Sequence, residues 1–167
     1  MSAALELYDF TDKGQGYAQL AAALQSLLAG EPDPIANAAN LAALLYHSLP
    51  ELNWVGFYFV RAGELVLGPF QGKPACVRIA FGRGVCGTAA SRRSSVVVQD
   101  VSRFPGHIAC DPQSCAELVV PLLAGERLLG VLDLDSPRVG RFDEEDRRGI
   151  EQLAQIYLQS TAAAAPP

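Results

Sequence analysis

The spacing of apolar residues predicts two helices at the start of the chain. Leucine and alanine recur at helical spacing over residues 17–29, with Thr11 or Asp12 available as an N-terminal cap. A second apolar run covers residues 35–49 and follows Asp33 and a proline, a pair typical of a helix start. We therefore expect a helix over each run.

From residue 53 onward the pattern becomes that of strands. Aromatic and β-branched residues fill 54–60, and a short run at 64–67 follows a glycine-containing turn, which predicts a β-hairpin. Further strands are predicted at 76–80, 96–99, 116–123 and 127–136, with loops at 68–75 and 100–115 and a short helix at 85–91. A long last helix opens with Asp143 and Asp146 in capping-box positions.

The order of these elements indicates the fold class. Because the strands follow one another through hairpins rather than through regular βαβ units, we predict an α+β fold on a largely antiparallel sheet of about six strands. A chain of 167 residues that is half apolar has the size of one domain. We expect a single domain over residues 1–167, with a frayed tail at 161–167.

Charge and hydropathy exclude several kinds of partner. The net charge is −5 and no cluster of Lys or Arg is present, which argues against binding to nucleic acid. The first residues lack the basic and apolar regions of a signal peptide, and no apolar stretch approaches the roughly 18 residues of a membrane span. We expect a cytoplasmic protein that binds no membrane.

Four cysteines are the first candidates for chemistry: Cys76, Cys86, Cys110 and Cys115. A framework of structural disulfides is not favoured in the cytoplasm, so we interpret them as free or redox-active thiols. Burial as a small apolar residue is the alternative for any one of them. Their neighbours in the sequence must decide between the two interpretations.

Two of the cysteines have neighbours that can favour a thiolate. Cys86 lies at the start of the predicted short helix, where free N–H groups and Arg83 supply positive charge. Cys110 follows His107 by three residues, although the adjacent Asp111 opposes a thiolate. Both His107 and Cys110 lie in the long loop, and long irregular connections in compact domains are often functional.

Three acidic residues are predicted to meet on one face of the sheet. Alternation along the last strand places Asp133 and Asp135 on the same face, and the tight turn after residue 123 brings Glu117 beside them. Such a group is costly unless a cation compensates it or one acid stays protonated, whereas a solvated sheet face is the plain alternative.

A ligand ammonium suits these acids better than a metal ion. Mg²⁺ or Ca²⁺ would need further oxygen ligands, which do not cluster nearby, and His47 and His107 are far apart in the sequence. We therefore expect no metal ligands. Trp54 and Tyr58, four residues apart on a strand, share a face and form an aromatic wall for an apolar or thioether-like group, with core packing as the alternative.

A reactive thiol, other thiols that can resolve it, an acidic pocket and an aromatic wall together suit the reduction of a sulfoxide. The motifs that carry this set are LNWVGFY (52–58), LGPFQGKPAC (67–76), GRGVCG (82–87), FPGHIACD (104–111), ELVVPL (117–122) and GVLDLDSP (130–137). In these segments, and over residues 8–158 as a whole, the chain resembles the GAF-domain free methionine-(R)-sulfoxide reductases.

The resemblance implies a single GAF domain with the N- and C-terminal helices on one face of the sheet and the ligand pocket on the other. It also implies that Cys110 attacks the sulfoxide. Cys76 is favoured as the resolving thiol, with Cys86 as the alternative or as a relay to an external reductant. That reductant would be NADPH-linked thioredoxin, with no bound cofactor, and the enzyme would form a homodimer.

For the substrate, the resemblance implies that Glu117, Asp133 and Asp135 hold the ammonium and polarise or protonate the sulfoxide oxygen. Trp54 and Tyr58 would enclose the methyl sulfoxide. The family commonly has Asn-Ser before the glutamate, whereas this chain has Cys115 and an alanine. Cys115 is therefore not expected in the shared mechanism, although it lies close enough in sequence to intercept a sulfenic acid on Cys110. A non-catalytic GAF module that binds a small molecule or senses oxidants is the alternative function.

Overall fold

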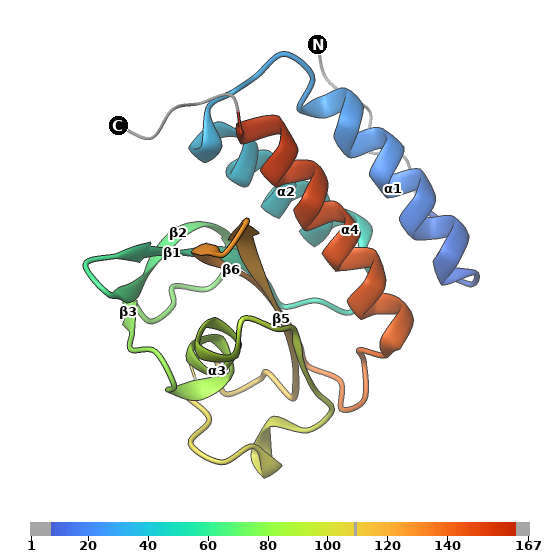
Figure 1. The fold of residues 1–167 in the computed structure, drawn as a ribbon. Helices are drawn as coiled ribbons and strands as arrows, with labels where there is room; N and C mark the ends of the chain where they lie inside the picture. Colours follow the sequence, from blue (N-terminus) through green and yellow to red (C-terminus); the bar gives the residue numbers. More distant parts are fainter. Residues whose placement is uncertain (1–7, 109, 163–167) are drawn as a thin grey trace.

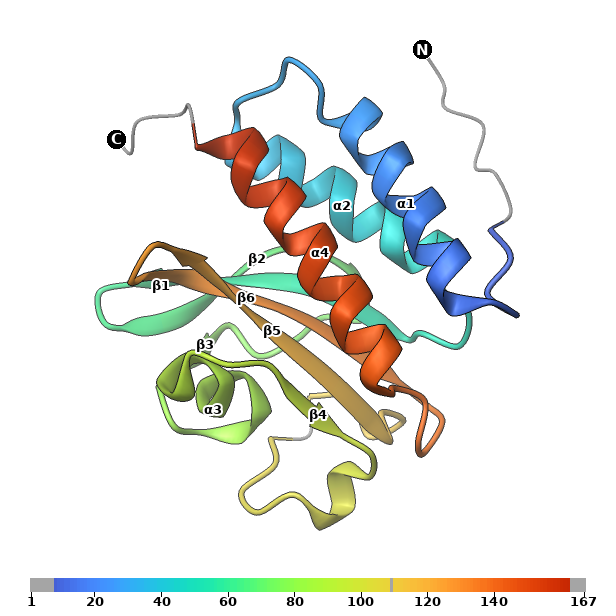
Figure 2. The ribbon, with the colours of Figure 1, turned by 45° about the vertical axis from the view of Figure 1, so that its right-hand side comes forward.

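The computed structural model describes residues 8–108 and 110–162. Three long helices, α1 (Lys13–Leu27), α2 (Pro34–Ser48) and α4 (Glu144–Thr161), lie on one side of the sheet, where α2 and α4 pack on its face and α1 packs on these two helices, as Figures 1 and 2 show. The predicted frayed tail lies outside the described residues from position 163 onward.

Polar caps set the starts of these helices. The Asp12 side chain accepts a hydrogen bond from the Gln15 N–H, so α1 begins four residues before the apolar repeat that predicted it. Asp33 caps α2 in the same manner. Asp143 and Asp146 form the predicted capping box at the start of α4.

The six strands form one sheet in the order β3-β2-β1-β6-β5-β4, and every neighbouring pair is antiparallel. Their bounds are β1 (Trp54–Arg61), β2 (Glu64–Gly72), β3 (Arg78–Ile79), β4 (Val96–Val98), β5 (Ala116–Ala124) and β6 (Arg127–Ser136). The α+β fold and the antiparallel sheet of six strands are therefore confirmed. The first and the last strand, β1 and β6, lie at the centre.

Two boundaries differ from the prediction. Strand β2 continues to Gly72, where a loop was expected over 68–75, because a register shift between Gly56 and Tyr58 accommodates Gly68 and Pro69 and lets pairing with β1 resume at Phe70. Strand β3 contains only Arg78 and Ile79 of the expected 76–80, since only these two residues pair with β2.

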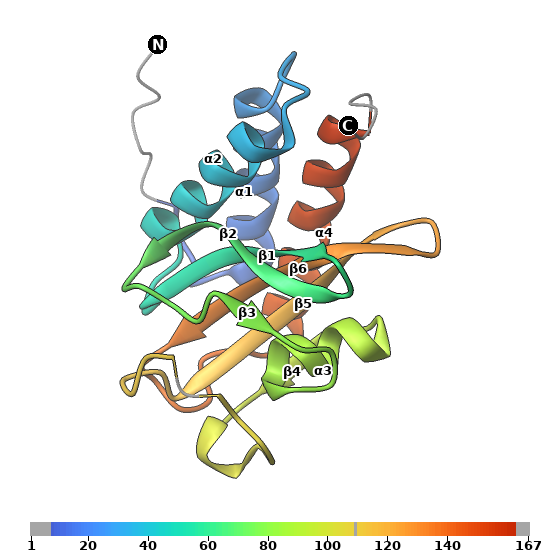
Figure 3. The same ribbon diagram turned by 90° about the vertical axis from the view of Figure 1, so that its left-hand side faces the viewer.

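The sheet separates two apolar cores. Leu132 and Leu134 of β6 point into the core beneath the three long helices. The opposite face packs against α3 (Gly84–Arg92), as Figure 3 shows, and its buried residues include Trp54 and Tyr58. The predicted arrangement, with helices on one face and the pocket on the other, is confirmed. Among the described residues, none of the helices combines the length and apolar character needed to span a bilayer.

Candidate active site

A pocket lies between the second face of the sheet, the start of α3 and the loop that follows the short 3-10 helix η1 (Val101–Arg103). It contains about 540 Å³ of empty space, including its opening to solvent. Of the predicted site residues, the pocket lining includes Trp54, Tyr58, Cys86, Cys110, Glu117, Asp133 and Asp135. Cys76 is attached to this set through a disulfide.

The three predicted acids meet on adjacent strands. Glu117 of β5 lies opposite Asp135 of β6 in the sheet register, and Asp133 lies two residues along the same strand. Glu117 and Asp133 are each only 6 % exposed, whereas Asp135 is partly exposed near the opening. Asp133 Oδ1 is buried and has no hydrogen-bond partner in the described part of the chain. The alternative of a solvated sheet face is therefore wrong.

Burial and mutual repulsion favour the protonated form of these acids. Burial raises the pKa of Glu117 well above its usual range, and the Asp135 carboxylate raises it further. Burial likewise raises the pKa of Asp133, with Glu117 as the next cause, and the pKa of Asp135, with Asp133 as the next cause. These shifts favour protonated acids that can donate a proton, whereas a cationic ligand would favour the carboxylates.

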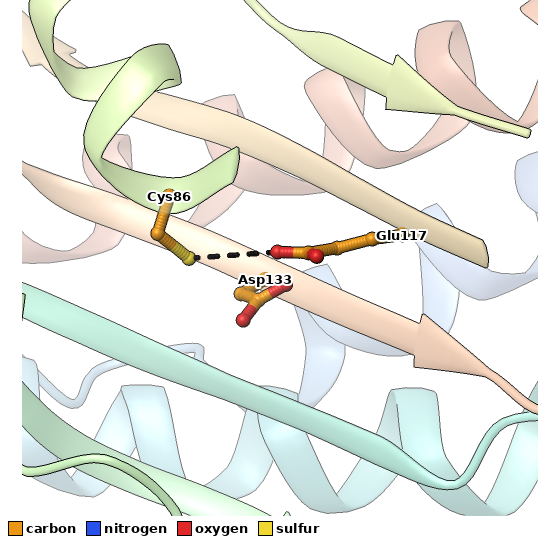
Figure 4. A group of neighbouring side chains, drawn as sticks. All are labelled: Cys86, Glu117 and Asp133. Carbon is orange, nitrogen blue, oxygen red and sulfur yellow. Dashed lines mark hydrogen bonds between the residues drawn. The ribbon is translucent and has the colours of Figure 1, made fainter. Parts of the chain in front are cut away.

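Cys86 lies in the floor of the pocket, beside the acids. Its side chain comes from the first turn of α3 and points toward Glu117 and Asp133, with Sγ 3.9 Å from Glu117 Oε1 (Figure 4). Burial raises the pKa of the Cys86 thiol well above its ordinary value, and the two carboxyl groups raise it further. The expectation that the helix start and Arg83 favour a thiolate here is wrong, because desolvation and negative neighbours outweigh them.

Cys110 forms a disulfide with Cys76, with 5.9 Å between the two Cα atoms. Cys110 is exposed at the rim of the pocket, in the segment after residue 108. The Tyr58 hydroxyl donates a hydrogen bond of 2.9 Å to the Cys76 carbonyl, so a strand residue of the pocket also positions the partner cysteine. Cys86 remains a free, buried thiol.

The loop that carries Cys110 is fastened by residues that the sequence analysis did not select. Asn53 donates a hydrogen bond of 3.0 Å to Ser114 Oγ, and Lys73 Nζ lies 3.3 Å from Asp111 Oδ2. Both Asn53 and Lys73 belong to the motifs of the family resemblance, which was the available signal. Asp111 is thus paired with Lys73 at the pocket edge.

His107 lies beside Glu117. The two side chains approach to 3.4 Å between Nε2 and Oε2, and the His107 side chain is 15 % exposed. Burial lowers the pKa of His107, which favours the neutral imidazole. The sequence had suggested an influence on Cys110, and the structure adds a contact with the acidic group.

The aromatic wall forms as predicted and is larger than predicted. Trp54 stacks on Tyr58 at 5.9 Å between ring centroids and on Phe70 of β2 at 5.4 Å. Gly56 lies between Trp54 and Tyr58, and a side chain there would overlap the Trp54 ring and Phe70. Trp54 and Tyr58 line the pocket, so an apolar ligand group can pack against them.

Cys115 lies apart from this group. It is partly exposed, its Sγ lies 3.6 Å from the Gln113 carbonyl oxygen, and it is not among the lining residues. The arrangement as a whole can bind a small cation with an apolar end, deliver a proton, and cycle between two thiols and a disulfide.

Comparisons with known proteins agree with this geometry. The GAF domain family matches residues 37–159. The chain is 51 % identical over 142 residues to the free methionine-R-sulfoxide reductase of Escherichia coli, covering 85 % of this chain and 86 % of that protein. It is 42 % identical to the Saccharomyces cerevisiae protein of the same name, covering 85 % and 83 %.

A solved structure matches almost the full length. The free methionine-R-sulfoxide reductase of Neisseria meningitidis, in complex with its substrate, superposes with a TM-score of 0.92 at 44 % identity, and the match covers 98 % of each chain.

Proposed function

Because the chain belongs to the GAF domain family and, within it, to the free methionine-R-sulfoxide reductases, we propose that it reduces free methionine (R)-sulfoxide to methionine. The observation that carries this proposal is the Cys76–Cys110 disulfide at the rim of a pocket with buried acids and an aromatic wall. Neither the acids nor the disulfide alone would identify a sulfoxide as the substrate.

The reaction starts from the enzyme with both cysteines reduced. The Cys110 thiolate attacks the sulfoxide sulfur, a protonated acid of the pocket donates a proton to the oxygen, and the oxygen passes to Cys110 as the S–O bond of the substrate breaks. Methionine leaves, and Cys110 is a sulfenic acid. Attack by the Cys76 thiol then forms the disulfide and releases the oxygen as water. Glu117 is the favoured proton donor, because burial raises its pKa.

The acids also explain a preference for the free amino acid. Asp133 and Asp135 hold the ammonium, while Trp54 and Tyr58 pack against the methyl sulfoxide. A methionine sulfoxide inside a peptide has no ammonium to offer, and its backbone would have to enter a pocket lined by buried carboxyl groups. Desolvating those groups without a cation is costly.

A dithiol reductant returns the enzyme to its starting state. We assign this role to thioredoxin, itself reduced from NADPH, because Cys110 is exposed in the disulfide and an attacking thiolate can reach it. The exchange makes Cys76 and Cys110 thiols and leaves thioredoxin oxidised. We propose that this reaction repairs oxidised methionine and that it takes place in the cytoplasm, and a homodimer stays a prediction.

The test is a turnover assay on three substrates: the R and S epimers of free methionine sulfoxide and a peptide that contains methionine sulfoxide. It is run once with dithiothreitol and once with thioredoxin, thioredoxin reductase and NADPH. We expect consumption of the free R epimer only. Cys110→Ser should lower kcat by about 10⁴-fold or more, since the nucleophile is lost, whereas Cys115→Ser should keep full activity.

Two outcomes would contradict the proposal. If the wild type consumed none of these substrates with dithiothreitol, a binding or sensing role would replace the enzyme. If Cys110→Ser retained activity, the nucleophile would be another residue. Turnover with dithiothreitol but not with thioredoxin would reject only the assigned reductant.

A further inference from the structure

A thiol and two carboxyl groups from three separate elements meet at the floor of the pocket (Figure 4). The donor atoms of Cys86 on α3, Glu117 on β5 and Asp133 on β6 all lie within 4.8 Å of one another. We propose that these three residues form a binding site for a divalent, thiophilic metal ion of the zinc class.

The geometry is close to that of a metal site. In tetrahedral zinc sites a thiolate lies about 2.3 Å and a carboxylate oxygen about 2.1 Å from the ion, which puts sulfur and oxygen about 3.6 Å apart. The distance between Cys86 Sγ and Glu117 Oε1 is 3.9 Å. This pair is therefore within about 0.3 Å of the spacing of zinc ligands, and the donor atoms of all three residues lie within 4.8 Å of one another.

The burial of the donors provides an independent reason for a cation. Cys86 is 3 % exposed, and Glu117 and Asp133 are each 6 % exposed. Asp133 Oδ1 has no hydrogen-bond partner among the described residues, so a buried acid of the cluster has an oxygen without a partner. An ion of charge +2 would supply the missing partner and offset two of the three negative charges of a thiolate and two carboxylates.

The donor types select the kind of ion. Mg²⁺ and Ca²⁺ prefer six or more oxygen ligands, whereas a thiolate favours Zn²⁺ or Cd²⁺. The fourth position is available to water. Acids and histidines alone provide too few ligands for a metal in the sequence, which is why none was predicted. The contact between Cys86 and the acids depends on how α3 packs on the sheet.

Metal binding changes the pocket in a defined way. As the metal binds, the Cys86 thiol proton and any protons held by Glu117 and Asp133 leave to solvent, and the two carboxylates bind the ion instead of the substrate. Bound metal and free methionine sulfoxide therefore exclude each other. This exclusion rests on the proposed function, whereas metal binding itself does not.

The experiment uses the Cys115→Ser protein in its disulfide form. Cys76 and Cys110 are then joined, so Cys86 is the remaining thiol. Titration with Cd²⁺ is followed by the ultraviolet absorption of sulfur-to-cadmium charge transfer, and Zn²⁺ affinity is measured against a chromophoric chelator. We expect one ion per chain.

Further substitutions in that background test the ligands. Cys86→Ala should abolish the charge-transfer absorption. Glu117→Gln should weaken Zn²⁺ binding about 10-fold or more, because even outer-shell changes cost that much. The control is Glu126→Gln, which changes an exposed acid in the turn between β5 and β6 and should leave the affinity unchanged. Saturating methionine sulfoxide should raise the apparent Kd for Zn²⁺ about 10-fold or more.

Several results would overturn the proposal. The first is that the protein binds no metal, and the second is that the charge-transfer absorption persists in Cys86→Ala. The third is that Glu117→Gln and Glu126→Gln lose equal amounts of Zn²⁺ affinity. If Cys86→Ala does not fold, as judged by thermal unfolding, the comparison of the two glutamate variants decides. An unchanged Kd in the presence of substrate would reject the exclusion. Since the readout is spectroscopic, a protein without reductase activity would leave the metal result intact.

Discussion

Asp133 lies in an environment that suits a bound ligand better than an empty pocket. Its strand is central, with Gly56 opposite on β1 and Val119 opposite on β5, so the backbone cannot move to bring the carboxyl group to solvent. Its Oδ1 is unpartnered and Glu117 is beside it. Destabilising groups of this kind are typical of functional sites, because the ligand supplies the compensation.

We therefore expect Asp133→Asn to stabilise the ligand-free protein and to weaken substrate binding. The amide removes a buried acid next to another acid, so the free energy of unfolding of the ligand-free protein should rise by about 1 kcal/mol. The KM for free methionine sulfoxide should rise by about 10- to 100-fold, since a charged hydrogen bond to the ammonium is lost. Thermal unfolding and steady-state kinetics measure the two effects.

The matched control is Asp100→Asn, which changes an acid outside the pocket lining that accepts hydrogen bonds from Ser102. It should leave KM unchanged. A lower melting temperature together with an unchanged KM in Asp133→Asn would show that the carboxyl group has a structural role instead.

At the scale of elements, the contact between α1 and α4 is unusually close at Gly149. A methyl group at this position, in the middle of α4, would overlap the ring of Tyr17 on α1. The Tyr17 hydroxyl also donates a hydrogen bond of 2.8 Å to Asp146 Oδ1, which fixes the ring against α4. Glycine here is therefore a packing requirement rather than a helix-breaking signal.

Gly149→Ala should lower the free energy of unfolding by about 1–2 kcal/mol, because the cost of overpacking exceeds the gain in helix propensity of about 1 kcal/mol. Gly14→Ala is the control. A methyl group at Gly14 on the exposed start of α1 would meet only Asp12 Oδ1, at 3.4 Å, so this variant should be as stable as the wild type or more stable. Urea unfolding of both variants and of the wild type measures these free energies. A Gly149→Ala protein more stable than the wild type would refute the packing argument.

The sequence predicted elements well where the deciding interaction is local. Asp33 and the Asp143–Asp146 pair cap helices within their own segments, so the helix starts could be read directly. The end of β2 could not, because Gly68 and Pro69 remain in the sheet only through a register shift against β1. The pKa of Cys86 could not be predicted correctly for a related reason, because its acidic neighbours come from strands β5 and β6, far away in the sequence.

The whole molecule divides into a helical layer that stabilises the sheet and a pocket layer that contains the reactive groups. The disulfide between Cys76 and Cys110 belongs to the pocket layer and joins residues 34 positions apart. Closing a loop of this size restricts the unfolded chain and is worth about 3–4 kcal/mol. The redox state should therefore change the stability of the entire domain.

Guanidinium unfolding with and without dithiothreitol tests this expectation. The disulfide form of the wild type should be more stable than the reduced form by about 3–4 kcal/mol. Cys110→Ser, which cannot form this disulfide, should unfold at the same denaturant concentration in both conditions. Equal midpoints for oxidised and reduced wild type would show that the disulfide does not constrain the unfolded chain as the loop length implies.

A contact in the site could be predicted from the sequence where regular strands make it, but not where an irregular loop makes it. Glu117 and Asp133 meet because of strand alternation and a tight hairpin, which are regular features of the chain. The contact of His107 with Glu117 and that of Asn53 with Ser114 depend on the path of a loop without periodicity. No spacing rule specifies such a path, so those contacts required the structure.

The central position of β6 has a consequence for the nascent chain. Before residues 127–136 are synthesised, β3-β2-β1 and β5-β4 are two groups of strands with no shared edge, because β6 is the strand that joins them. Domains fold as units during translation, and here the unit is incomplete until its last strand leaves the ribosome. All four cysteines precede the acids of β6 in the sequence, so the reactive thiols are translated before the pocket that contains them can assemble.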